Sequence, residues 1–298
     1  MHSISLPDAD TRITYPDGAT SSVGRVVFIA ELTDGRIGVI LDQTAFHPVD
    51  TAWPDQPADR GTLEFDGHSV PVIDAVIGGI HDGELFVGTD VPVRTGTDGW
   101  VFTVVHVVAG AESGSAPQSV PAVGTQVRVE VDDAFRRELS AGHTACHLAS
   151  LALDAALADA WTKPVAGDAL GSPAFDSLAI QTSRIHANGS VDTYRVGKSL
   201  RKKGFDTSVL EDLAAIEAGA NAQLTEWVTA GGPVRIVRTD DTITARRSWV
   251  CELPDATAEI PCGGTHVDDL SALGGVTVSL AVQPVTGGLE VEMRTTVA

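Results

Sequence analysis

The chain has 298 residues and a formal net charge of −20 at pH 7, from 40 acidic side chains against 20 lysines and arginines. Its length allows two domains of ordinary size, each with a buried core, and its composition is that of a soluble globular protein. A chain this acidic repels polyanions unless its few bases are gathered in one place, so we expect no DNA partner.

The first part of the chain has the pattern of β-structure. Between Val23 and Val131, short β-branched runs are separated by Asp-Gly, Gly-Gly and Pro-containing turns, which is typical of strands joined by tight turns. The runs are VGRVVFIA, RIGVIL, HSVPVI, WVFTVVHVV and QVRVEV. They predict an all-β barrel or sandwich. Residues 109–124 are rich in Gly, Ser, Ala and Pro, as expected of an exposed connection, and we place a domain boundary near residue 128.

The second part, residues 129–298, combines helices with strands. After Asp133 the apolar residues recur three, four or six positions apart in an Ala-rich stretch that ends near Trp161, which predicts a long helix. A second helix is predicted over residues 209–228, with Ser208 and Glu211 at capping-box spacing. The later runs PVRIV, TITARRSWV, VTVSLAV and LEVEMRTTV predict strands. This order of elements indicates an α+β domain with an antiparallel sheet.

Two residue pairs in the second part have the spacing of metal ligands. His143 and His147 in HTACH lie four apart, which on a helix stacks both imidazoles on one face. Thr144 stands where a zinc peptidase of the His-Glu-x-x-His type would carry its glutamate, so peptidase chemistry of that kind is disfavoured. Cys262 and His266 in PCGGTH add a thiolate and an imidazole across a Gly-Gly turn, and this donor set favours zinc.

The cysteines and the N-terminus bear on the expected compartment. Three cysteines, Cys146, Cys251 and Cys262, are an odd number, which argues against a disulfide framework and leaves thiols or metal ligands. Cys146 lies next to His147, and neighbours on a helix point about 100° apart, so we expect it in the core. The first residues show no basic start with an apolar run after it, and no apolar stretch is long enough for a membrane span. We expect a cytoplasmic protein.

The bases of this acidic chain are concentrated in one window. Between residues 195 and 203 there are five bases and no acid, namely Arg195, Lys198, Arg201, Lys202 and Lys203. Such a run can contact the phosphates of an RNA, and it can also be a solvated turn between strands. Arg136 and Arg137, on the predicted metal-binding helix, are weaker candidates for the same role.

The sequence resembles a family, the alanyl-tRNA editing proteins, whose editing domain is shared with alanyl-tRNA and threonyl-tRNA synthetases. The segments HTACHL and IPCGGTHV are similar to the family's His-x-x-x-His and Cys-x-x-x-His metal motifs. Further similarity lies in RRELSAGHTACHL, in GFD at 204–206 followed by a helix with Glu217 and Asn221, and in LDQTAFHP with QPADRGTL. These segments stand in the family's order and cover most of residues 39–275.

The resemblance implies an N-terminal β-barrel over residues 1–128 and, over residues 129–298, an editing domain of the threonyl/alanyl-tRNA synthetase type. It implies a Zn²⁺-dependent hydrolase that acts in trans on mischarged tRNA, by preference seryl-tRNA(Ala), through metal-activated water. No side chain is assigned as the general base. The metal ligands that the resemblance carries over are His143, His147, Cys262 and His266.

One segment departs from the family pattern. Where the family has a Gly-rich run leading into Gln, this chain has VDTAWPDQ at residues 49–56, and Trp53 with Pro54 cannot reproduce a flexible glycine track. His47 also replaces the aromatic residue expected beside Phe46. The sequence therefore leaves open which amino acid is removed.

Two further functions remain as alternatives. A metal-dependent hydrolase of another small ester or amide would account for the altered 49–56 segment and for the acidity. A non-catalytic binding module stabilised by zinc is the other, because four protein ligands make a closed tetrahedral site, whereas catalysis needs three ligands and an open position.

Overall fold

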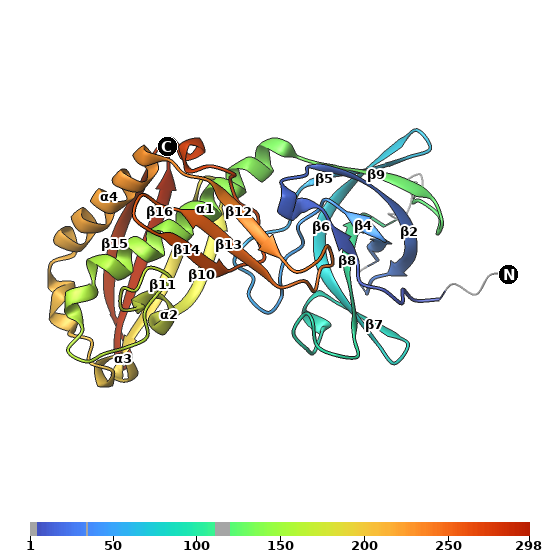
Figure 1. Cartoon of the computed structure of the whole chain (residues 1–298). Coiled ribbons are helices and arrows are strands. Elements are labelled where there is room, and N and C mark those ends of the chain that lie inside the picture. The colour runs from blue at the N-terminus through green and yellow to red at the C-terminus, as the bar shows by residue number, and fades with distance from the viewer. Residues whose placement is uncertain (1–4, 34, 111–119) are drawn as a thin grey trace. The chain divides into compact units, whose positions relative to one another are not determined.

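The computed structural model describes residues 5–33, 35–110 and 120–298, so residues 111–119 of the expected connection lie outside the described part (Figure 1). The chain splits into two compact units. Unit 1 takes in the chain up to Arg136 together with Arg238–Arg247, and unit 2 consists of Arg137–Val237 with Ser248–Ala298. Among the described residues, no helix combines the length and the apolar character needed to cross a membrane.

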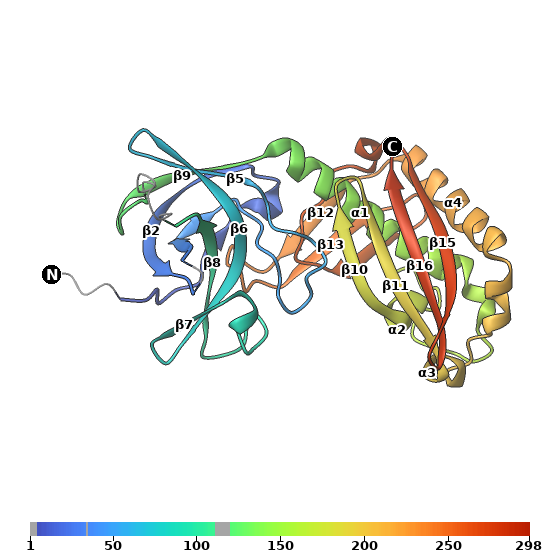
Figure 2. The same cartoon turned by 180° about the vertical axis from the view of Figure 1, so that it is seen from behind.

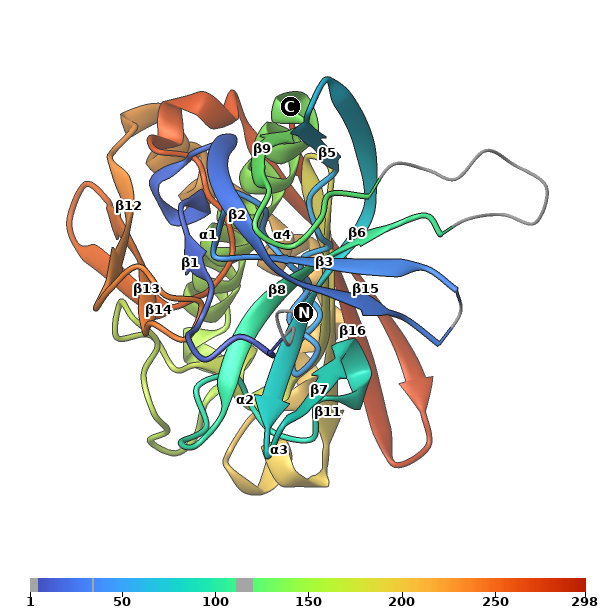
Figure 3. The same cartoon turned by 90° about the vertical axis from the view of Figure 1, so that its right-hand side faces the viewer.

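The described residues of unit 1 form nine strands, six of which make a closed ring (Figures 1 and 3). The strands are β1 (Arg12–Ile13), β2 (Ser21–Glu31), β3 (Ile37–Leu41), β4 (Gln43–Thr44), β5 (Gly61–Phe65), β6 (His68–His81), β7 (Glu84–Val87), β8 (Val101–Val108) and β9 (Gln126–Val131). The order in the sheet is β5-β9-β2-β3-β8-β6-β7, and the additional pairing of β5 with β6 closes the ring. All of these pairings are antiparallel. The ring contains each of the five strands predicted from the β-branched runs.

The core of unit 1 consists of the inward-facing apolar residues of the ring, such as Val39, Leu63 and Phe102, which are fully buried. A buried ion pair accompanies this core. The guanidinium of Arg136 donates to both carboxylate oxygens of Asp59 and to the carbonyl of Ala45, with side chains 5% and 0% exposed. Arg136 is therefore not available to contact a phosphate, contrary to its sequence-based candidacy, because a partner distant in sequence binds it.

Unit 2 is an antiparallel four-stranded sheet with helices on one face, as the α+β prediction requires (Figures 1 and 2). Its helices are α1 (Asp133–Ala156), which begins in unit 1, α2 (Phe175–Ala179), α3 (Lys198–Lys202) and α4 (Leu213–Ala230). Its strands are β10 (Ile180–His186), β11 (Gly189–Gly197), β12 (Val234–Arg238), β13 (Arg247–Glu252), β14 (Thr257–Pro261), β15 (Val276–Val285) and β16 (Gly288–Val297). The large sheet has the order β10-β11-β16-β15, and β12-β13-β14 form a second sheet.

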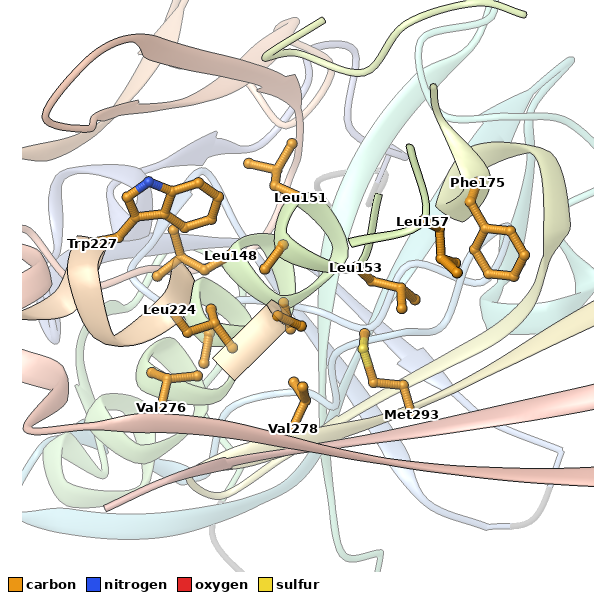
Figure 4. Close-up of a cluster of buried hydrophobic side chains, with 14 of the residues drawn as sticks. Leu148, Leu151, Leu153, Leu157, Phe175, Leu224, Trp227, Val276, Val278 and Met293 are labelled. Carbon is orange, nitrogen blue, oxygen red and sulfur yellow. The ribbon is translucent and has the colours of Figure 1, made fainter. Parts of the chain in front are cut away.

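The core of unit 2 lies between the two long helices and the large sheet. Figure 4 shows side chains of α1, of α4 and of strands β15 and β16 meeting in this layer, with Phe175 of α2 at its margin. The residues drawn include Leu148, Leu151 and Leu153 of α1 and Leu157 just after its end, all at most 2% exposed. This apolar stripe is continuous with the two histidines because His143 and His147 precede it at helical spacing.

One sequence-based expectation for unit 2 needs correction, and one of its hairpins was missed. The predicted helix over 209–228 begins only at Leu213, because Asp212 caps it by accepting from the backbone N–H of Ala215, and a short 3-10 helix (Thr207–Glu211) precedes it. The Ser208–Glu211 capping box is therefore wrong. The hairpin of β10 and β11, at the heart of the unit, was not predicted.

Candidate metal centre

Helix α1 is fixed on the β10–β11 turn next to the first histidine. The backbone N–H of Asn188 donates to the backbone carbonyl of Glu138 at 2.9 Å. At Gly142 the helix approaches so closely that a Cβ atom would lie 2.5 Å from the carbonyl oxygen of His186 and 2.7 Å from that of Gly189. Only glycine permits this approach. The position of His143 is thus set by the packing of its neighbour.

The four predicted ligands converge. His143 and His147 come from α1, whereas Cys262 and His266 come from the loop that follows β14. One donor atom from each of the four lies within 4.8 Å of all the others, and His143 is buried while the rest are partly exposed. The Sγ atom of Cys262 lies 3.4 Å from Nε2 of His143 and 3.3 Å from Nε2 of His266.

Two of the distances between the donor atoms are those expected around a bound metal ion such as zinc. A tetrahedron with Zn–S of about 2.3 Å and Zn–N of about 2.0–2.1 Å has S–N edges of about 3.5 Å, close to the two sulfur–nitrogen distances. The buried Nε2 atom of His147 has no hydrogen-bond partner among the described residues, which is costly for a polar atom unless a ligand binds it. Burial lowers the pKa of His147 to about 4, so its imidazole is in the neutral form that a metal requires.

A second stripe on α1 holds the loop that carries Cys262 and His266. Ser140 and Thr144 are four apart, like the histidine pair, and both are buried. The Ser140 hydroxyl donates to the hydroxyl of Thr265 at 3.0 Å. The Thr144 hydroxyl accepts from the backbone N–H of Val267 at 3.2 Å and lies 3.2 Å from Nδ1 of His266. If Nε2 of His266 is a ligand, its Nδ1–H donates to Thr144 and fixes the ring orientation.

Sequence reasoning missed this role for Thr144, because that residue was judged only by the glutamate it replaces. The signal was present, since Ser140 and Thr144 repeat the spacing of the histidines three positions earlier in the helix. Trp249 of β13 was also missed. Its ring centroid lies 5.0 Å from that of His147 and 6.1 Å from that of His266, so it forms an apolar wall beside the group.

Cys146 lies outside the four-residue group. Its Sγ atom is 3.6 Å from Oδ1 of Asp192 and 3.7 Å from Oγ of Ser183. Asp192 also accepts hydrogen bonds from Ser183 at 2.5 Å and from Ser190 at 2.8 Å. Burial raises the pKa of the Cys146 thiol well above its ordinary value, and the negative charge of Asp192 raises it further. The thiol is therefore protonated at neutral pH and is not a nucleophile.

The basic window lies at the end of β11 and along α3. Lys198, Arg201, Lys202 and Lys203 are exposed. Arg195, on β11, is only partly exposed, and its guanidinium donates to the carbonyl of Thr286. The window therefore divides into four solvent-facing cations and one arginine attached to the neighbouring hairpin.

Two residues of the quoted segments, Glu217 and Asn221, attach α4 to the sheet. The side-chain Nδ2 group of Asn221 donates to the carbonyl of Val278 at 2.9 Å, and its Oδ1 atom accepts from the backbone N–H of Val278 at 2.7 Å. The carboxylate of Glu217 accepts from the backbone N–H of Leu280 at 2.6 Å. Both contacts are made to β15, an edge strand, so these residues have a structural role.

The departing segment 49–56 belongs to unit 1. Trp53 is 44% exposed, whereas Gln56 is 1% exposed and its Nε2 atom lies 3.4 Å from Nδ1 of His47. Burial, with the positive charges of Arg136 and Arg247, lowers the pKa of His47 to about 3. His47 is therefore a neutral core residue with a hydrogen-bonding role.

The fold and the site together define an α+β protein with a His–His–Cys–His group that could hold a metal ion. No family model matches the chain. The alanine–tRNA ligase of Halobacterium salinarum is 28% identical over 294 residues, which are 96% of this chain and 26% of the ligase. The alanine–tRNA ligase of Frankia casuarinae is 28% identical over 243 residues, 82% of this chain and 22% of the ligase.

A relative of similar size is the alanyl-tRNA editing protein AlaX-M of Pyrococcus horikoshii, 26% identical over 268 residues, which are 89% of both chains. The chain spans about a quarter of the length of the ligases it matches. It is therefore a homologue of the alanyl-tRNA editing protein along most of its length, which confirms the resemblance seen in the motifs.

Proposed function

We propose that this protein is a zinc-dependent editing hydrolase that acts in trans and removes the wrong amino acid from mischarged tRNA, by preference seryl-tRNA(Ala). The observation that carries the proposal is the convergence of His143, His147, Cys262 and His266 in a homologue of an alanyl-tRNA editing protein. In this proposal the six-stranded ring of unit 1 is the β-barrel, and unit 2 is the editing domain of the synthetase type.

The residues around the site have distinct roles in this reaction. His143 and His147 would hold the metal from α1, and Cys262 with His266 from the loop, while Ser140 and Thr144 hold that loop in place. When bound, zinc polarises the ester carbonyl and lowers the pKa of a water molecule from 15.7 to about 7. Trp249 shields one side of the site from solvent. An aminoacyl ester is activated relative to an amide, so no strong side-chain base is needed.

The test is release of serine from purified seryl-tRNA(Ala), with and without a chelator. The purified chain should release serine in the presence of zinc, and the chelator or the substitution His143→Ala should abolish release. Cys251→Ser is the matched control, because Cys251 lies outside the four-residue group. Equal release by the His143→Ala variant at saturating zinc would refute the proposal.

Because the segment 49–56 is altered, the amino acid that this protein removes needs a test with several charged tRNAs. Trp53 and Pro54 stand where the family has a Gly-rich run, and Trp53 is exposed. Seryl-, glycyl- and alanyl-tRNA(Ala) should be compared in the same assay. If none is hydrolysed while a small ester is, the alternative of a metal-dependent hydrolase of another ester or amide is favoured.

The number of donors favours a second candidate, a binding module with structural zinc. Four protein ligands complete a tetrahedron and leave no position for substrate. In that case metal removal should unfold unit 2, because the formation of a closed site and folding are coupled. An intact fold without zinc, together with zinc-dependent serine release, would exclude this candidate.

A further inference from the structure

An open hollow lies in the segment that follows α1. Its volume is about 410 Å³, and residues between Ala158 and Pro173 line it, including Trp161, Thr162 and Lys163. Trp161 is partly exposed, and its buried indole N–H has no acceptor among the described residues. The hollow therefore offers an aromatic surface and a cation.

The hollow is joined to the basic turn after α3. The backbone N–H and the hydroxyl of Thr162 both donate to the carbonyl of Gly204 at 2.9 Å. The ammonium group of Lys163 donates to the carbonyl of Lys202 at 3.0 Å. The rings of Trp161 and Phe205 meet edge to face, with centroids 5.1 Å apart. Figures 1 and 2 show this segment and α3 at the same end of the large sheet.

The turn is positively charged in a strongly acidic protein. Lys198, Arg201, Lys202 and Lys203 are exposed, and no carboxylate of the described residues forms an ion pair with them. The nearby carboxylate of Asp206 is engaged by the backbone and the hydroxyl of Ser208. The whole chain has a net charge of −20, which opposes the binding of polyanions, so a surface with four unpaired cations is where a polyanion would be tolerated.

We propose that the Trp161 hollow and the α3 turn form a binding site for an unpaired stretch of RNA. The four cations would contact phosphates, and one base would stack on the ring of Trp161. Unpaired RNA is favoured over a duplex, because an aromatic ring can stack only on a base that is free of its helix. The biological meaning of this site rests on the proposed function, in which the RNA is the end of the mischarged tRNA.

The position of the hollow suits that substrate. It follows the C-terminal end of α1, and His147 lies nine residues before that end, which corresponds to about 14 Å along the helix. About four nucleotides, stacked at about 3.4 Å each, cover the same length. A short unpaired tail held at the hollow can therefore extend as far as the proposed metal centre.

The experiment measures binding of a labelled eight-nucleotide single-stranded RNA, and of a duplex of the same sequence, to the full zinc-loaded chain over a series of salt concentrations. The double variant Lys202→Gln/Lys203→Gln should reduce the slope of log K against log salt by about 1.4, since each phosphate contact to a single strand contributes about 0.7. The matched control is Arg235→Gln/Arg294→Gln. It removes the same charge from exposed arginines that are paired with Glu252 and Glu292.

Trp161→Leu should weaken single-strand binding about 5- to 150-fold, as expected for the loss of one stacked base. If this variant unfolds, the Lys202→Gln/Lys203→Gln variant still tests the site, because both lysines are exposed and their substitution leaves the core unchanged. Equal slopes for the lysine and control variants, or equal affinity for duplex and single strand, would overturn the site. Its failure is distinguishable from failure of the proposed function, since His143→Ala should abolish serine release and leave binding of the eight-nucleotide RNA unchanged.

Discussion

Thr144→Val is the substitution that most directly tests how the proposed metal centre is held. Valine has nearly the same shape as threonine but no hydroxyl, and Thr144 is fully buried, so the change removes hydrogen bonds without opening a cavity. It deprives the backbone N–H of Val267 of its acceptor and His266 of the partner of its Nδ1 atom. We expect zinc affinity to fall while the fold remains.

The magnitude follows from these two contacts. Loss of a residue that orients a metal-ligating histidine reduces metal affinity about 10- to 100-fold, which is about 1.4–2.7 kcal/mol. A buried polar group left without its partner costs about 1–3 kcal/mol, in the same range. Thr144→Ser keeps the hydroxyl and should retain most of the affinity.

The assay is competition for zinc between the protein and a chromophoric chelator, with the absorption spectrum of the cobalt-substituted protein as a second readout. Thr295→Val is the matched control, because Thr295 is equally buried and its hydroxyl has no partner among the described residues. The reasoning fails if Thr144→Val binds zinc within twofold of the wild type, or if Thr144→Ser loses as much affinity as Thr144→Val.

Three further predictions concern stability. Arg136→Met leaves the Asp59 carboxylate buried without its cation and should lower the free energy of unfolding in urea by about 3–5 kcal/mol; a loss below about 1 kcal/mol contradicts the ion pair's role. Gly142→Ala should destabilise the fold by about 1–3 kcal/mol, because the added Cβ atom would lie 2.5 Å from a carbonyl oxygen of the β10–β11 turn. Gly219→Ala is the control and should stabilise by up to about 1 kcal/mol, because the nearest neighbour of its Cβ atom lies at 3.6 Å. Equal urea midpoints of the two variants would refute the close contact at Gly142. Burial raises the pKa of Asp154 to about 8, so the folded chain keeps a proton that the unfolded chain loses above about pH 4, and stability is lost as the pH rises between these values. The advantage of Asp154→Asn over wild type in urea midpoint should therefore grow from pH 5 to pH 8, and a constant or shrinking difference would contradict this sign.

The ligand residues could be predicted because each pair is a local pattern. His143 with His147, and Cys262 with His266, need only four residues of sequence to show their spacing. That the two pairs meet is a tertiary fact, and it was inferred from their joint donor set and from the resemblance to the editing proteins. The contact of Arg136 with Asp59 could not be predicted for the same reason, since 77 residues separate the two.

The β10–β11 hairpin was missed for a different reason. Its inward positions include Ser183, Ser190 and Asp192, which are buried and bonded to one another, so the alternation of apolar and polar residues that predicts a strand is broken. The start of α4 was misplaced because Asp212 competes with Ser208 as a cap, and only the backbone decides between them.

The attachment of α4 to β15 has a consequence for how this protein behaves in a crowded solution. β15 is the last strand of its sheet, and such a strand can recruit a strand of another chain through its free backbone groups. Asn221 occupies both groups of Val278, and Glu217 occupies the N–H of Leu280. Side chains of α4 thus make the hydrogen bonds that a neighbouring strand would make. At these positions a strand of another chain cannot pair with β15, which reduces aggregation through this edge.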